Sequence, residues 1–169
     1  LDAGQPLKIS NVTVVIMGGA AKSTGDTDAS RVLGIATPFE GDCILQLYPA
    51  RIAEQGKDGL GALQLTAAHE LFHCVQYATW PDLMAEFDNH NWWVEGTAET
   101  VAQAVFPNIE EAFRWGFNFS NRFRDTPLTK LTYENVVFFS WVWADDPKLL
   151  FRIISAMPVG GNEAAQQQA

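Results

Sequence analysis

Hydrophobic residues in the first third of the chain fall into three short runs that predict β-strands. Residues 7–17 are rich in β-branched side chains, and residues 32–37 and 43–48 form two further apolar runs, separated by the turn-forming segment 38–42. Residues 20–30 hold Ser, Thr, Gly and Asp, which indicates an exposed connection. We therefore expect a small N-terminal β-sheet. Its third strand directly precedes the helical region and is the candidate wall of any cleft beside that region.

The next part of the chain has the periodicity of a helix. From residue 60 to about residue 79, apolar side chains recur at intervals of three and four and cover one arc. His69 and His73 lie on the opposite arc together with Thr66 and Gln76. We expect the apolar arc to be buried and the histidine arc to be left for another role. The apolar arc consists of Leu60, Leu63, Ala67, Leu71, Cys74, Val75 and Ala78.

Further helices are predicted downstream. Residues 82–91 form a polar connection with room for a short helical turn, and a helix is expected at 92–105, where Pro107 stops it. Asp146 is the expected N-cap of the last helix, with Pro147 in its first turn. The other predicted helices are 108–124, in which Phe113, Trp115, Phe117 and Phe119 are packing residues, 133–143, and 147–157.

These elements predict an α+β fold, with a small N-terminal sheet followed by a long helix and a mainly helical C-terminal part. A length of 169 residues suits one domain, and 47% hydrophobic residues can supply its core. We expect this domain to cover residues 1–159. Residues 160–169 are Gln-rich and of low complexity, so a disordered tail or a severed linker is expected there.

Charge and hydropathy exclude two classes of partner. The net charge of -9 argues against nucleic acid, because binding to phosphate backbones needs clustered Lys and Arg. The apolar runs are far shorter than the ~20 residues that cross a bilayer, so no membrane span is expected. No basic and apolar targeting segment is visible in the chain, and localisation must therefore be inferred indirectly.

The two cysteines, Cys43 and Cys74, are too few for a disulfide scaffold and lack the spacing of a structural zinc site. They form either one bridge or two buried free thiols. A bridge would join the third predicted strand to the helix at 60–79 and would suit an exported protein.

The strongest chemical signal is the pattern H-E-x-x-H, formed by His69, Glu70 and His73. Two histidines four residues apart lie on one face of a helix, so both imidazoles can reach the same cation, with Glu70 one step round the helix. This arrangement is typical of zinc hydrolases. The alternative without a metal site is a pair of surface histidines with a glutamate between them.

A catalytic zinc site normally has three protein ligands, so a third must come from elsewhere. His90 is the only other histidine. Glu95 lies in a separate predicted helix that could pack against the first, and Glu99 follows it by four residues on the same face. Two like charges at this spacing repel, so either both face solvent or a cation or histidine compensates them.

Residues 92–99, Trp-Trp-Val-Glu-Gly-Thr-Ala-Glu, add a second motif to H-E-x-x-H. The combination resembles the gluzincin branch of zinc metallopeptidases. In that branch the H-E-x-x-H helix is followed by a second helix that opens with W-x-x-E-G-x-A-E or a similar sequence. The resemblance covers mainly residues 60–105 and implies a zincin-like fold. It further implies His69, His73 and Glu95 as zinc ligands, Glu70 as the general base, and Glu99 as a carboxylate that orients a ligand histidine.

Tyr133 opens the sequence Tyr-Glu-Asn-Val at the start of the predicted helix 133–143. Aminopeptidase-like gluzincins place a proton-donating tyrosine at the head of a similar Y-E-x-G helix, so the resemblance implies that Tyr133 stabilises the oxyanion. The alternative is a tyrosine that packs at a helix start, and Tyr77 and His90 are further candidate donors. No G-x-M-E-N-like motif precedes the first helix, so exopeptidase activity is not expected.

The expected function is zinc-dependent hydrolysis of peptide bonds, with Zn²⁺ as the cofactor and a peptide or protein as the substrate. In this hypothesis Glu70 activates a zinc-bound water. The alternatives are a non-catalytic zincin-like domain for binding or scaffolding, and an incomplete fragment of a larger metallopeptidase. The expected location is extracellular or in the cell envelope.

Overall fold

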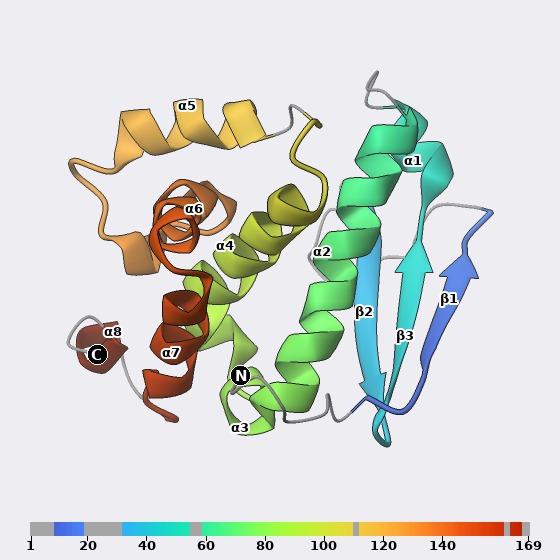
Figure 1. The fold of residues 1–169 in the computed structure, drawn as a ribbon, viewed down its shortest axis with the longest axis horizontal. Helices are drawn as coiled ribbons and strands as arrows, with labels where there is room; N and C mark the ends of the chain where they lie inside the picture. The colour runs from blue at the N-terminus through green and yellow to red at the C-terminus, as the bar shows by residue number, and fades with distance from the viewer. Residues whose placement is uncertain (1–8, 19–31, 55–58, 110–111, 161–162, 167–169) are drawn as a thin grey trace.

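A β-sheet lies on one side of the molecule and a group of helices on the other, so the fold is α+β (Figure 1). The computed structural model describes residues 9–18, 32–54, 59–109, 112–160 and 163–166. The strands are β1 (Val12–Ile16), β2 (Gly34–Phe39) and β3 (Asp42–Leu47). The helices are α1 (Pro49–Glu54), α2 (Gly59–Thr79), α3 (Pro81–Met84), α4 (Phe87–Val105), α5 (Ala112–Arg122), α6 (Val136–Asp145), α7 (Pro147–Ala156) and α8 (Glu163–Gln166), with 3₁₀ turns η1 (Leu128–Lys130) and η2 (Tyr133–Asn135).

The sheet has the strand order β1-β3-β2, with β1 parallel and β2 antiparallel to β3. A tight hairpin joins β2 to β3. Its two loop residues, Glu40 (φ 46°) and Gly41 (φ 88°), both have positive φ, as a type I′ turn requires. This turn reverses the chain within two residues, so β2 and β3 are neighbours. Because β1 pairs with the other side of β3, β3 is the central strand and β2 lies at an edge of the described sheet.

The three predicted strands are confirmed, with ends that differ by a few residues. β2 and β3 begin within two residues of the predicted runs 32–37 and 43–48. β1 occupies the C-terminal part of the predicted strand 7–17, whose first two residues lie outside the described residues. The expected connection at 20–30 also lies outside the described residues.

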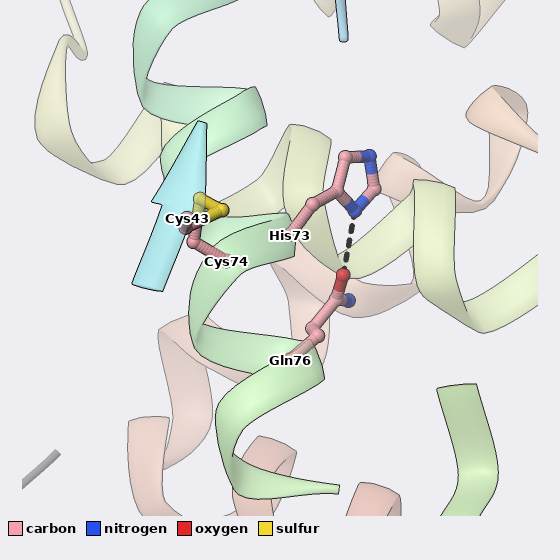
Figure 2. The surroundings of a disulfide bond; sticks show 4 residues. All are labelled: Cys43, His73, Cys74 and Gln76. Carbon is pink, nitrogen blue, oxygen red and sulfur yellow. Dashed lines mark hydrogen bonds between the residues drawn. A yellow bond between two sulfur atoms is a disulfide. The ribbon is translucent and has the colours of Figure 1, made fainter. Parts of the chain in front are cut away.

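Helix α2 covers one face of β2 and β3 (Figure 1). Cys43, Leu45 and Leu47 alternate along β3 and are 2–4% exposed, so every second residue of this strand is buried. Cys43 is bonded to Cys74 of α2, with Cα atoms 5.8 Å apart (Figure 2). The bridge, rather than two free thiols, is therefore the outcome, and it fastens α2 to the central strand.

The expected burial of α2 on one apolar arc is wrong. Leu60 and Leu71 of that arc are 66% and 43% exposed, whereas His69, His73 and Gln76 of the opposite arc are buried. The reason is that α2 is covered on two sides, by the sheet and by α4. Periodicity assumes one buried face, and it cannot reveal a second helix that packs on the polar arc.

A second core forms among the helices, where α4 packs against α6 and α6 against α7. Gly96 of α4 allows close approach, because a Cβ atom there would lie 2.8 Å from Asn135 Cβ and 2.9 Å from Phe139 Cδ2. Asp146 caps α7 as predicted, since its side chain accepts a hydrogen bond from the Lys148 N–H at 2.9 Å. Fully buried members of this core include Trp93, Phe139, Leu150 and Ile154.

One segment differs from the sequence prediction. Helix α4 begins at Phe87, so the predicted polar connection at 82–91 is largely helical. Neither Gly nor Pro occurs between Pro81 and Gly96, and polarity alone does not break a helix. Within residues 160–169, for which a disordered tail or a severed linker was expected, α8 is described. Gln166 of α8 is buried, and its Oε1 accepts a hydrogen bond from Trp92 Nε1 at 2.7 Å. Among the described residues, no helix combines the length and hydrophobicity needed to cross a membrane.

We predict that the Cys43–Cys74 bridge contributes substantially to stability. It closes a loop with a sequence separation of 31 residues. The double variant Cys43→Ala/Cys74→Ala should lose about 3–4 kcal/mol of unfolding free energy, because its unfolded chain is less restricted. Urea unfolding of oxidised wild type, reduced wild type and the variant measures the difference. Equal midpoints for all three would contradict the prediction.

Candidate metal centre

Two histidines of α2 and one glutamate of α4 converge in the interior. His69 Nε2 and His73 Nε2 lie 2.9 Å apart, and Glu95 Oε2 lies 3.1 Å from the first and 3.7 Å from the second. Ligands of a tetrahedral zinc ion, with bonds of about 2.0–2.1 Å, are about 3.3 Å apart. The buried His69, His73 and Glu95 therefore fit a metal ion, and the predicted ligands come together.

The charges of this cluster compensate one another. Burial alone would raise the pKa of Glu95, but its hydrogen bonds with His69 and His73 hold this pKa far below the usual range. Burial alone would lower the pKa of His69, but hydrogen bonds with Glu95 and Glu99 raise it well above its ordinary value. The carboxylates of Glu95 and Glu99 thus favour a positive charge at His69, beside the position where a cation would bind.

Glu99 occupies the position that its spacing from Glu95 predicts, one turn further along α4. Its Oε2 lies 3.4 Å from His69 Nδ1, on the side of the imidazole away from the ligand nitrogen. Such a contact fixes the ring so that Nε2 faces the cation. Neither glutamate is a solvated surface residue, because both face histidine nitrogens.

Gln76 fixes the ring of His73, as Glu99 fixes the ring of His69. Sequence reasoning did not assign this role to Gln76. Its Nε2 donates to Val94 O at 3.0 Å and to Thr97 Oγ1 at 2.9 Å, so its Oε1 must face His73. His73 Nδ1 therefore donates to Gln76 Oε1 at 2.6 Å, so Nε2 is the nitrogen that faces His69 and Glu95 and can act as the metal ligand (Figure 2). The feature of the sequence that could have indicated this role is the position of Gln76 on the same arc of the helix as the two histidines.

Glu70 lies against β2 rather than against β3, the strand expected to form the wall of the cleft. The difference arises because β1 pairs with β3, which leaves β2 as the edge strand beside this part of α2. Burial raises the pKa of Glu70, while the charges of His69 and His73 and the Ala36 N–H, which donates to its carboxylate, oppose this shift. A buried carboxylate of this kind suits the acceptance of a proton.

Gly34 makes room for Glu70. A Cβ atom at this position would lie 2.6 Å from Glu70 Cγ and 2.9 Å from Thr66 Cγ2. The Thr66 hydroxyl donates to Ala62 O at 2.8 Å, so its methyl group is held in place. Sequence reasoning missed this residue, although a glycine within a predicted strand is a signal of close approach.

Tyr133 also reaches the centre, at the start of η2. Its ring stacks on the His69 imidazole with centroids 5.9 Å apart, and it remains 37% exposed. Burial and the nearby carboxylate of Glu95, with which its side chain forms a hydrogen bond, raise the pKa of Tyr133. Tyr77 packs against the helical core, and burial together with the charges of Glu95 and Glu70 raises the pKa of its hydroxyl, so this candidate donor also lies near carboxylates of the centre. The side chain of His90 lies outside the described part of the chain.

The fold and the site together define an α+β protein with a buried His-His-Glu cluster that can hold a metal ion. Comparisons with protein-family models, with curated proteins and with solved structures found no match. The assignment of roles therefore depends on the geometry of the residues themselves.

We predict that Gln76→Met weakens zinc binding by about 10–100-fold, as is typical when the partner of a metal ligand is lost. The variant keeps the length of the side chain but removes the acceptor that holds His73 Nδ1. Competition with a chromophoric chelator measures the affinity. Gln64→Met is the matched control, because Gln64 lies half-buried on the same helix. Equal affinities for the two variants would contradict this role of Gln76.

We predict that Gly34→Ala destabilises the protein by about 1–3 kcal/mol, because the added methyl group overpacks the space beside Glu70 and Thr66. Gly116→Ala serves as the control, since a Cβ atom on Gly116 meets nothing within 4 Å. Urea unfolding followed by circular dichroism distinguishes them. A Gly34→Ala variant as stable as the wild type would show that Glu70 is not held where the structure places it.

Proposed function

We propose that the protein is a zinc-dependent peptidase of the gluzincin type, with a zincin-like fold. The observation that carries this proposal is the convergence of His69, His73 and Glu95, with the carboxylate of Glu70 beside them. Two imidazoles and one carboxylate are a frequent donor set of catalytic zinc, which keeps a further position for water or substrate. The resemblance of the two sequence motifs to gluzincins supports the same choice of metal.

Glu70 and Tyr133 have separate roles in the proposed hydrolysis. Zinc, when bound, supplies a Lewis acid that acidifies a water molecule and polarises the substrate carbonyl. Glu70 accepts the proton of the attacking water as the new C–O bond forms, and it returns this proton to the amide nitrogen as the C–N bond breaks. The Tyr133 hydroxyl donates a hydrogen bond to the oxyanion, which its partly exposed position beside His69 allows.

An extended peptide is the proposed substrate, and the position of β2 supports this choice. Within the described sheet β2 pairs with β3 on one side, and its other edge faces Glu70, to which the Ala36 N–H donates. A substrate strand can add to such an edge through main-chain hydrogen bonds. The disulfide supports a location in an oxidising compartment, such as the cell exterior or envelope.

We predict that Glu70→Gln binds zinc about as well as the wild type but hydrolyses peptides at least about 100-fold more slowly, because it removes the general base and no ligand. Cleavage of casein and of a mixed peptide library is measured with zinc and after chelation. Glu54→Gln, which alters an exposed carboxylate on α1, is the control and should keep full activity.

Each outcome separates the alternatives. Full activity of Glu70→Gln would show that the mechanism is wrong. Zinc binding by the wild type without any cleavage would favour a non-catalytic binding or scaffold domain. An anomalous-scattering zinc peak between His69, His73 and Glu95 would establish the ligands independently of activity.

A further inference from the structure

Trp115 of α5 contacts two residues of the metal centre at once. Its Nε1 donates to Glu99 Oε1 at 2.7 Å, and its indole stacks on the Tyr133 ring with centroids 5.1 Å apart and an interplanar angle of 14°. Glu99 and Tyr133 each contact the ligand His69, the first at Nδ1 and the second by stacking. These four residues, Trp115, Glu99, His69 and Tyr133, form a closed ring of contacts.

The turn that carries Tyr133 is anchored on both sides. Glu134 pairs with Arg122 of α5 and accepts a hydrogen bond from the Thr132 N–H at 3.1 Å. Asn135 Nδ2 donates to Trp92 O of α4 at 3.1 Å. Trp115 and Arg122 are seven residues apart and lie on one face of α5, so this helix holds η2 at two points.

Ordinary packing does not account for Trp115. Its neighbour on the same helix, Phe117, is 70% exposed, whereas Trp115 is half-buried against the site. The bond from an indole N–H to a carboxylate is charge-assisted and directional, and apolar packing would not require it. The same carboxylate uses its other oxygen for His69, so the orientation of Glu99 depends on both partners.

We propose that Trp115 is a positioning residue of the metal centre, which holds Glu99 against His69 and supports the ring of Tyr133. Its influence on turnover rests on the proposed function, but its influence on metal binding does not. Without the indole N–H, Glu99 loses the bond that fixes its second oxygen and orients His69 less well. Without the indole ring, Tyr133 also loses the stacking contact with Trp115.

The test is a double-mutant cycle on metal affinity, which does not require catalysis. Trp115→Phe keeps an aromatic ring and removes the N–H, and it should weaken Zn²⁺ and Co²⁺ binding about three- to tenfold, less than the loss of a direct partner of a ligand. In a Glu99→Ala background the same substitution should change the affinity less than about twofold, because the partner through which it acts is gone. Trp141→Phe is the control, since Trp141 is 70% exposed on α6.

Equal losses on Trp115→Phe in both backgrounds, or no loss in either, would overturn the proposal. Thermal unfolding of each variant identifies losses that come from general destabilisation, which would be the same with and without Glu99. If the wild type hydrolyses peptides, Trp115→Leu should lower kcat more than Trp115→Phe at similar metal affinity, with KM little changed. If the wild type binds zinc without hydrolysis, the proposed function fails, and the affinity cycle still decides the role of Trp115.

Discussion

The burial of Glu95 against His69 and His73 is the interaction on which the rest of the site depends. A carboxylate that is only 7% exposed would be strongly destabilising without partners, and here two imidazoles at 3.1 and 3.7 Å supply them. This compensation is possible only where α4 packs along the histidine arc of α2. Because the sheet covers another side of α2, the helix has two buried sides. Its leucines at positions 60 and 71 are left at the surface as a consequence.

Two glycines make this packing possible, and each acts next to a carboxylate of the site. Gly34 lets β2 approach Glu70, and Gly96 lets α4 approach η2, which begins with Tyr133, and α6. At both positions a Cβ atom would come within 3.0 Å of a neighbouring side chain. The small size of glycine, rather than its freedom in φ, is what matters here. The E-G-x-A-E pattern thus has a physical reason, since the residue after the ligand Glu95 must admit a close contact on the next face of the helix.

The spacing of residues along one helix predicted which side chains share a face of that helix. The spacing of His69 and His73 sets one face of a helix, as does the spacing of Glu95 and the glutamate that follows it by four residues. The resemblance of residues 92–99 to gluzincins implied that the two faces meet at one metal ion. The roles of Gln76 and Trp115 could not be predicted, because each depends on which group lies opposite in space. The strand beside the site was misplaced for the same reason, since chain order favours β3 whereas the pairing of β1 with β3 leaves β2 at the edge.

One turn of α2 is held from two sides, which ties the sheet to the metal centre. Cys74 is bonded to the central strand, while Gln76, which accepts the hydrogen bond of His73, donates to Val94 O and Thr97 Oγ1 of α4 (Figure 2). A rotation of α2 about its axis would break one of these contacts or strain the other. Such a rotation would also carry Glu70 away from the edge of β2, where a substrate strand is proposed to bind. The disulfide and the glutamine therefore restrict the same motion, so the position of the proposed base relative to β2 and to Glu95 of α4 depends on both.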